Sequence, residues 1–113
     1  MRFDLISIFP DYFTPLTLSL MGKAEDAGLV TLAAHDLRQW ATGKHRSVDD
    51  TPYGGGAGMV MRADVWACAL DEVLAISLRA GDEDAAPASS RRILAIPTPS
   101  GTPLTQPLVE DLA

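Results

Sequence analysis

The stretch F-D-L-I-S-I-F, residues Phe3–Phe9, stands near the start of the chain and ends at Pro10. It is rich in apolar, β-branched and aromatic residues, which is typical of a largely buried β-strand. A second stretch of this kind, Leu29–Ala34, follows after a segment with helical character. The opening of the chain is therefore predicted to be strand, helix, strand.

The helical segment between these strands carries its own start and stop signals. Asp11 can cap a helix that is interrupted near Pro15 and continues to about Ala27. Gly28 then stands at the position where a glycine commonly ends a helix. These signals support a helix that crosses from one strand to the next.

The next part of the chain combines a long loop with a second helix. Residues 36–40 predict a short helical turn, and residues 41–58 show no periodicity. A loop of about eighteen residues is longer than an ordinary connection in a compact domain, and loops of this length are often functional. The helix is expected at Ala63–Leu78 and includes Cys68, which we expect in the core. Its apolar positions at helical spacing are Trp66, Leu70, Val73 and Ile76.

Four further segments complete the prediction: a short strand at Met59–Met61, an exposed acidic loop at Ala80–Ser90, a strand at Arg92–Ile96 and a helical segment from Thr105. Strands that alternate with helices predict an α/β domain with a mainly parallel sheet and flanking helices. Three or four strands make a thin sheet, and the last helical segment stops after about two turns without a cap. We therefore expect this chain to be the first part of a longer protein.

The composition excludes several classes of protein. The 113 residues fit one small domain or part of a larger one, and 47% hydrophobic content is typical of a globular chain. No run of about 18 apolar residues predicts a membrane span, and the N-terminus lacks the pattern of a signal peptide. One cysteine allows no internal disulfide. We expect a cytoplasmic protein.

The charge of the chain does not decide its partner. A net charge of −6 argues against nucleic acid. However, residues 1–62 carry seven acids and six bases, whereas residues 63–113 carry eight acids and three bases. The bases nearest the glycine-rich segment described next are Lys44, His45 and Arg46.

The glycine-rich segment is the strongest functional signal. Four of the five positions from Gly54 to Gly58 are glycine, preceded by D-D-T-P-Y and followed by M-V-M. Glycine is costly to order unless a position needs unusual dihedrals or close approach by a ligand. Both nucleotide motifs fail, because no Lys-Ser or Lys-Thr follows and no G-x-G-x-x-G follows the first strand. We interpret the segment as a binding loop, with a ligand-free glycine turn as the alternative.

Polar and aromatic residues before the glycines offer specific roles. Asp49 is predicted to hold the loop as an Asx-turn residue. Asp50 has that role or accepts hydrogen bonds from a base, acts as a general base or binds a metal. Tyr53 stacks on a nucleobase, worth about 1–3 kcal/mol per base, or packs on the sheet edge.

The basic and histidine residues are weaker candidates. Arg46 and His45 either contact phosphate or form solvated surface charge, and we favour surface charge for His45. His35 has no companion at metal-ligand spacing and is predicted to be structural.

A second candidate loop is I-P-T-P-S-G, residues Ile96–Gly101. It follows a predicted parallel strand at the edge where open α/β sheets bind ligands. Pro97 and Pro99 stiffen it and lack N–H donors, so the carbonyls of residues 96–98 are expected to be free acceptors for an adenine amino group. The alternative is an ordinary strand-to-helix turn.

These residues match a known family. H-R-S-V-D-D-T-P-Y-G-G-G-A-G-M-V-M, His45–Met61, closely resembles the bacterial tRNA (guanine-N1)-methyltransferases. F-D-L-I-S-I-F-P-D-Y-F at Phe3–Phe13, G-L-V at Gly28–Val30 and H-D-L-R at His35–Arg38 also fit, in the manner of actinobacterial members. The match weakens only across the acidic loop, and the D-D-x-P-Y-G-G-G-x-G-M string is highly specific.

The resemblance implies a trefoil-knotted α/β fold of the SPOUT class that works as a homodimer. It implies methyl transfer from S-adenosylmethionine to N1 of the guanosine 3′-adjacent to the anticodon of tRNA, with a divalent cation, magnesium. By position, Ile96, Pro97, Thr98 and Pro99 match the first loop around the adenosine of the cofactor. The matching residues of the target-guanine site are Asp50, Tyr53, Gly54, Gly55, Gly56 and Gly58, and Arg46 is assigned to the same substrate.

The resemblance also implies what this chain does not hold. The family's knot loops, principal catalytic aspartate and helical tRNA-binding domain correspond to segments beyond Ala113. Asp50 is therefore expected to assist, and the chain alone to be inactive. Two alternatives remain: a non-enzymatic purine-binding module, and an assembly fragment that dimerises.

Overall fold

The computed structural model describes residues 1–80 and 92–112. The chain forms two compact units, Met1–Glu83 and Asp84–Ala113. Most of the predicted acidic loop lies outside the described residues. Among those described, no helix is both long and apolar enough to cross a membrane.

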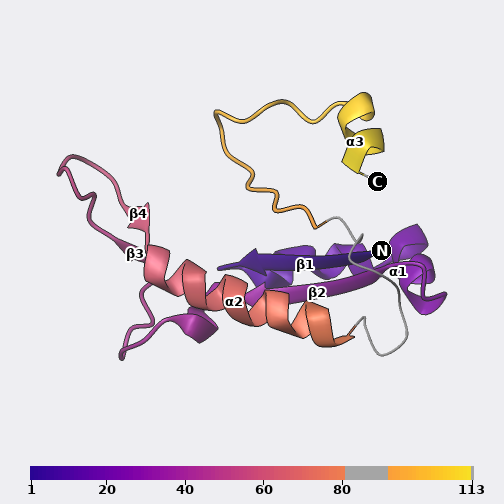
Figure 1. The fold of residues 1–113 in the computed structure, drawn as a ribbon, viewed down its shortest axis with the longest axis horizontal. Helices are drawn as coiled ribbons and strands as arrows, with labels where there is room; N and C mark the ends of the chain where they lie inside the picture. Colours follow the sequence, from indigo (N-terminus) through magenta and orange to yellow (C-terminus); the bar gives the residue numbers. More distant parts are fainter. Residues whose placement is uncertain (81–91, 113) are drawn as a thin grey trace. The chain divides into compact units, whose positions relative to one another are not determined.

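The first unit is built on a two-stranded parallel sheet (Figure 1). Strand β1 (Arg2–Ser7) pairs with β2 (Thr31–Asp36), from Arg2 opposite Thr31 to Ser7 opposite Asp36. This confirms an α/β fold with a parallel sheet, although the sheet has two strands here rather than three or four. The first strand is only partly buried, with Phe3 40% exposed, so the prediction of a largely buried strand is wrong.

The crossover between the strands is helical, as predicted, but its two helices meet at a different residue from the predicted one. It consists of the 3₁₀ helix η1 (Pro10–Thr17) and the α-helix α1 (Ser19–Asp26). The break lies at Leu18, whose backbone is extended, and not at Pro15, which lies inside η1.

The predicted cap at Asp11 is also wrong, whereas the predicted glycine stop is confirmed. Pro10, with its fixed φ, already begins the helix, which places Asp11 inside the first turn. Gly28 has φ +70°, and its N–H donates to the carbonyl of Glu25 at 2.9 Å. The left-handed backbone at Gly28 turns the chain towards β2.

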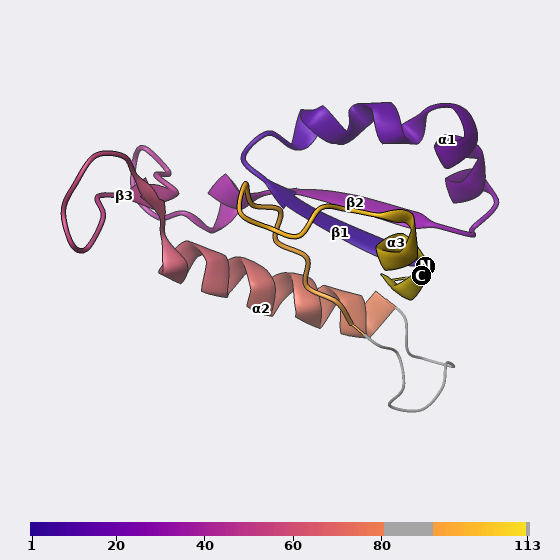
Figure 2. The ribbon, with the colours of Figure 1, turned by 90° about the horizontal axis from the view of Figure 1, so that it is seen from above.

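Helices lie on both sides of this sheet. Figure 2 shows η1 and α1 on one side and the helix α2 (Ala63–Ala80) on the other. Since side chains alternate along a strand, Leu5 and Leu32 face η1, where they help to line a hollow of about 310 Å³. Ile6 faces the other way and packs against the core.

The core of the first unit is small and lies on the α2 side. Its buried members are Leu37, Val48, Val65 and Ala69, and the partly buried side chains packed on it are Ile6, Ile8, Trp40, Ala41 and Trp66. Leu37 comes from η2 (Leu37–Trp40), which confirms the predicted short helical turn. Helix α2 confirms the second predicted helix.

The face of α2 that is buried is rotated from the predicted one but overlaps it, because Val73 is buried and Leu70 is half-buried, as predicted. The side chain of Ile76 lies outside the described residues. Val65, Ala69 and Val73 form its buried stripe, and Trp66 is half-buried beside them. Cys68 is exposed, so its prediction as a core residue is wrong. It lies between Val65 and Ala69 in the sequence but about 100° around the helix from the centre of the stripe formed by Val65, Ala69 and Val73.

The long loop contains regular structure that periodicity did not reveal. Strands β3 (Asp49–Asp50) and β4 (Val60–Met61) pair antiparallel, with Asp49 opposite Met61. The second of these confirms the predicted strand at residues 59–61. The glycines therefore form the tip of a short hairpin, and residues 41–58 are not one structureless loop.

In the second unit, helix α3 (Gln106–Leu112) confirms the predicted helical segment. The predicted strand at residues 92–96 is wrong: these residues are exposed and belong to no strand. A strand is defined by ladder hydrogen bonds, and no described segment pairs with this one.

Candidate functional site

The segment from residue 41 to residue 62 is fastened at its start to helix α2. Asp36 Oδ1 accepts the backbone N–H of Arg38 at 2.9 Å and so begins η2. At the end of η2, Trp40 Nε1 donates to Glu72 Oε2 at 2.7 Å. Residues 41–62 therefore begin at the end of η2, which is held against α2.

The middle of the segment is held by Val48. Its neighbours on both sides are exposed, whereas Val48 is 6% exposed and belongs to the core. Its carbonyl accepts the N–H of Arg62 at 2.9 Å, just before α2 begins. Val48 thereby divides the segment into a basic part, residues 41–47, and a hairpin, residues 49–61.

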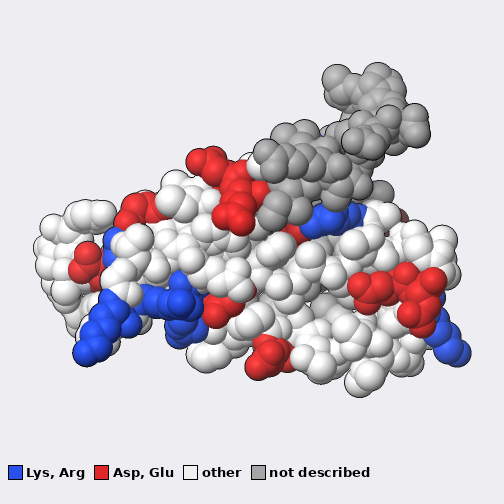
Figure 3. All heavy atoms as spheres, turned by 90° about the horizontal axis from the view of Figure 1, so that it is seen from below, with Lys and Arg blue, Asp and Glu red and all other residues white. Residues whose placement is uncertain are grey.

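The basic part is a solvent-exposed turn. Gly43 has φ +89°, and Arg46, with φ +46°, donates its N–H to the Gly43 carbonyl at 3.3 Å. Lys44, His45 and Arg46 are all exposed. In Figure 3, acidic and basic side chains lie next to one another in several places, and no region of one sign covers the face drawn.

The two aspartates begin the hairpin with different contacts. Ser47 Oγ donates to Asp49 Oδ1 at 3.1 Å, in agreement with a loop-holding role for Asp49. Asp50 Oδ1 accepts the backbone N–H of Thr51 at 2.7 Å. Both aspartates are exposed, so a ligand can reach their carboxylates.

The glycines separate into two kinds. Gly55, Gly56 and Gly58 have φ of +72°, +112° and +98°, which side chains rarely adopt. Gly54 is outside that region, and a Cβ built on it meets no atom within 4 Å. Backbone geometry therefore explains three of the four glycines, and Gly54 has no such explanation.

Tyr53, next to these glycines, is fully exposed, at 100%. It does not pack on a sheet edge, so that alternative is wrong. The turn behind it is closed by the N–H of Gly55, which donates to the carbonyl of Pro52 at 2.9 Å. The ring is thus presented to solvent beside a constrained backbone.

A charged pair stands where the hairpin meets α2. The Arg62 guanidinium donates to Asp64, and this hydrogen bond is the main cause that raises the pKa of Arg62 and lowers the pKa of Asp64. The charge of Asp50 acts on the pKa of Arg62 in the same direction. The guanidinium at the base of the glycine loop is therefore paired with a carboxylate.

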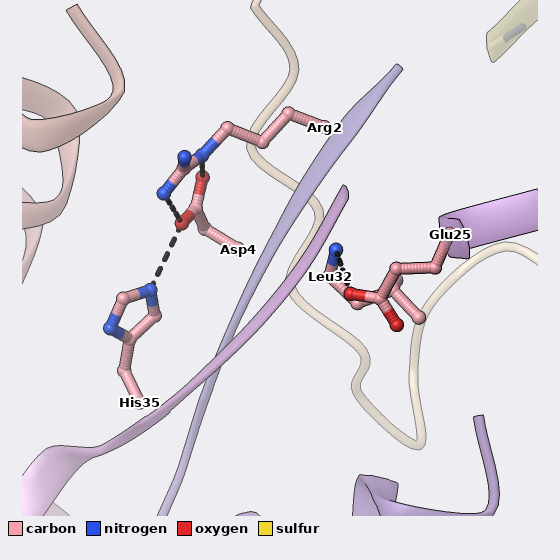
Figure 4. A network of polar contacts seen from close by, with 5 residues as sticks. All are labelled: Arg2, Asp4, Glu25, Leu32 and His35. Carbon is pink, nitrogen blue, oxygen red and sulfur yellow. Dashed lines mark hydrogen bonds and ion pairs between the residues drawn. The ribbon is translucent and has the colours of Figure 1, made fainter. Parts of the chain in front are cut away.

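His35 is tied to the sheet by a polar cluster, as its structural interpretation predicts. Figure 4 shows Asp4 between Arg2 and His35, with Arg2 Nη2 at 2.8 Å and His35 Nε2 at 2.9 Å from Asp4 Oδ1. The hydrogen bond from Arg2 is the main cause that lowers the pKa of Asp4, against the opposing effect of burial. A lone carboxylate inside an apolar strand was the sequence signal for this cluster.

The second candidate loop, Ile96–Gly101, belongs to the second unit. Its turn is closed by the N–H of Gly101, which donates to the carbonyl of Thr98 at 3.0 Å. The Thr98 carbonyl therefore already accepts one hydrogen bond and keeps one lone pair for a ligand, so it is only partly the free acceptor that was predicted. Residues 96–99 are exposed, and Ile96 is 71% exposed.

The resemblance implies two bound groups, the adenosine of the cofactor and a magnesium ion, and the described residues suit them differently. The exposed backbone at Ile96 and Pro97 supplies carbonyl acceptors, which fits an adenine amino group. For a cation, no three His, Cys, Asp or Glu side chains gather within residues 1–80 and 92–112. The described residues thus fit an adenosine group and do not form a magnesium site by themselves.

The structure brings some predicted residues together and adds others. Asp50, Tyr53 and the glycines share one hairpin, and Arg46 lies in the adjoining basic part of the same segment. The contact from Trp66 Nε1 to Met61 Sδ, at 3.3 Å, was missed, since Trp66 was interpreted only as an apolar helix position. The arrangement offers a carboxylate, an open aromatic ring and constrained backbone, which suits a planar polar ligand.

The comparisons with known proteins identify the family of this chain. The family model described as tRNA (Guanine-1)-methyltransferase TrmD matches residues 1–113. The chain belongs to this family of methyltransferases.

Several curated relatives carry the name tRNA (guanine-N(1)-)-methyltransferase. One from Arthrobacter sp. (strain FB24) is 55% identical over 113 residues, which is 100% of this chain and 39% of the relative. One from Thermobifida fusca (strain YX) is 56% identical over 106 residues, 94% of this chain and 37% of the relative. The chain thus spans about two fifths of the length of these relatives, which agrees with an N-terminal portion.

Proposed function

We propose that the protein to which this chain belongs transfers a methyl group to N1 of the guanosine 3′-adjacent to the anticodon of tRNA. The observation that carries the proposal is the family match over all 113 residues. The methyl donor is S-adenosylmethionine, and a magnesium ion assists. The protein works in the cytoplasm as a homodimer with a SPOUT-type trefoil knot, whose knot loops lie beyond this chain.

The chemistry defines what the residues of this chain have to do. N1 of guanine carries a proton at neutral pH, so its methylation needs a base and stabilisation of the charge that develops on O6. The principal base belongs to a segment beyond Ala113. In this chain Asp50 accepts a hydrogen bond from the guanine edge and assists in holding the base for deprotonation.

The hairpin tip forms part of the guanine pocket. Tyr53 stacks on the target base, Gly54 allows close approach of the backbone, and Gly55, Gly56 and Gly58 shape the loop. Arg46 binds a backbone phosphate of the tRNA. The full exposure of Tyr53 and the empty space at Gly54 support these roles.

The second loop binds the cofactor. The backbone of Ile96, Pro97, Thr98 and Pro99 surrounds the adenosine of S-adenosylmethionine, which, when bound, supplies the methyl group. The two prolines keep the loop in one conformation and so reduce the ordering cost of binding.

The test is transfer of labelled methyl from S-adenosylmethionine by the natural gene product that contains this chain. The substrates are tRNAs that carry either guanosine or adenosine just 3′ of the anticodon. Label on the guanosine tRNA alone supports the proposal, and the isolated 113-residue chain is expected to give none. Absence of label with folded natural product would contradict it and favour a purine-binding or assembly module.

A further inference from the structure

Three features of the described residues join the glycine hairpin to the packed part of the protein. Val48 is buried in the core, the Arg62 N–H binds the Val48 carbonyl at 2.9 Å, and Trp66 Nε1 donates to Met61 Sδ at 3.3 Å. The first two hold the place where the hairpin joins the core and α2. The contact from Trp66 is the one that reaches a strand of the hairpin itself.

Trp66 is suited to hold that strand because its ring is anchored. The ring packs against the core cluster, and the indole is half-buried on the first turns of α2. Met61, by contrast, is 48% exposed and is paired only with Asp49 in a ladder of two residue pairs. A ladder this short is marginal alone, so even a weak side-chain contact helps to fix its position.

We propose that Trp66 is a positioning residue, which fixes strand β4 through Met61 and thereby sets the place of the glycine loop for its substrate. The inference rests on the proposed function of that loop. A tryptophan on a helix and a methionine on a hairpin strand then act as one unit, although neither touches the substrate.

The chain offers a matched control for this claim. Trp40 is the other tryptophan, and its indole also donates one hydrogen bond, to Glu72 at 2.7 Å, but between η2 and α2. Trp40→Phe and Trp66→Phe each remove one indole N–H and keep an aromatic ring. Only Trp66→Phe removes a contact with the hairpin.

The first measurement is amide hydrogen exchange in the natural gene product without ligands. Trp66→Phe is expected to speed exchange of residues 49–61 about threefold, the size expected for a weak N–H to sulfur contact, and Trp40→Phe to leave them unchanged. Met61→Leu keeps the apolar volume, removes the acceptor and is expected to act like Trp66→Phe. In the double variant the two effects are not additive if they act through one contact.

The second measurement is steady-state methyl transfer to tRNA. Trp66→Phe is expected to lower kcat about threefold with a smaller change in KM for tRNA, because a loosened loop misplaces the bound base. Trp40→Phe loosens the start of the segment that carries Arg46, so it is expected to raise KM for tRNA slightly and to leave kcat within error, because the buried Val48 lies between that start and the hairpin. Equal losses of kcat in the two variants, or a lower Tm of Trp66→Phe with unchanged exchange and kcat, would overturn the positioning role.

The two proposals fail in different ways. If the wild-type protein transfers no methyl group, the proposed function fails, and the exchange data alone decide whether Trp66 positions the hairpin. If the wild type is active and Trp66→Phe matches it in both measurements, the positioning role fails and the proposed function stands.

Discussion

The two candidate binding loops contrast in how the protein supports them. The glycine loop stands on a hairpin whose base includes the buried Val48 and a hydrogen bond from Arg62. The loop at Ile96–Gly101 is shaped by its own turn, between Gly101 and Thr98, and its residues are exposed. The first loop therefore depends on the core of its unit, whereas the second depends on local geometry and its two prolines.

The largest effect should come from the core that supports the glycine loop. Leu37 is fully buried, at 0% exposure, so Leu37→Ala should lower the free energy of unfolding by about 3 kcal/mol. Ile96→Ala, at a side chain 71% exposed, should change it by less than about 0.5 kcal/mol. Chemical denaturation measures both, and similar losses would remove the contrast between the loops.

Two glycines of the glycine loop are expected to differ in why they are glycine. Gly56 is required by the backbone conformation, whereas Gly54 is required, if at all, by the ligand. Gly56→Ala forces a side chain into φ +112° and should cost about 1–2 kcal/mol of stability. Gly54→Ala meets open space at an ordinary φ and should be neutral or slightly stabilising.

Measuring methyl transfer by Gly54→Ala tests whether the ligand requires a glycine at this position. If the backbone at Gly54 approaches the guanine closely, Gly54→Ala should lower kcat/KM for tRNA at least about tenfold while stability is kept. Normal activity of Gly54→Ala would exclude close approach at this position. A large loss of stability in Gly54→Ala would instead mean that its backbone conformation is strained.

The smallest expected effect concerns the polar cluster of Arg2, Asp4 and His35 on the parallel sheet. The Arg2 hydrogen bond holds the pKa of Asp4 below its usual range. The carboxylate therefore stabilises the fold above the unfolded pKa of about 3.9, and this contribution is lost as the pH falls through the lower, folded-state pKa. Asp4→Asn should lose about 1 kcal/mol at pH 7, and the difference from wild type should shrink below pH ~4.

Unfolding curves at several pH values measure this difference. Asp71→Asn, at an exposed position on α2, serves as the control and should change stability by less than about 0.5 kcal/mol at every pH. A difference for Asp4→Asn that stays constant down to pH ~3 would show that the carboxylate charge does not stabilise the sheet.

Local signals in the sequence predicted much of this fold. Gly28 ends α1 with the expected left-handed backbone, and Asp36 caps the short helix that follows β2. Apolar spacing located α2 over nearly its full length. These features depend on residues a few positions apart, which is the range over which sequence patterns are informative.

Several of the misses depend on partners far away in the chain. Which side of α2 is buried depends on Leu37 and Val48, so Cys68 could not be placed by spacing alone. Residues 92–96 have the composition of a strand but lack a pairing partner among the described residues. The contact between Trp66 and Met61 is different, because it joins the end of β4 to the first turns of α2 across five residues and follows no periodic pattern in the sequence.

The sequence predicted which residues belong to the candidate site. It did not predict which core residue holds the site in place. The sequence located the glycine loop, because glycine clusters and the family resemblance are local features, but it left open whether Tyr53 is exposed or packs on the sheet edge. It did not predict that Val48 is the anchor between the basic part and the hairpin. That role needs the core, which forms only when β1, η2 and α2 come together.

The most direct test of this account is to identify the methylated nucleoside. tRNA treated with the natural gene product and S-adenosylmethionine would be digested, and its fragments analysed by mass spectrometry. The account predicts 1-methylguanosine at the position 3′-adjacent to the anticodon. Methylation at another position or on another atom of the base, or none by the folded protein, would contradict it.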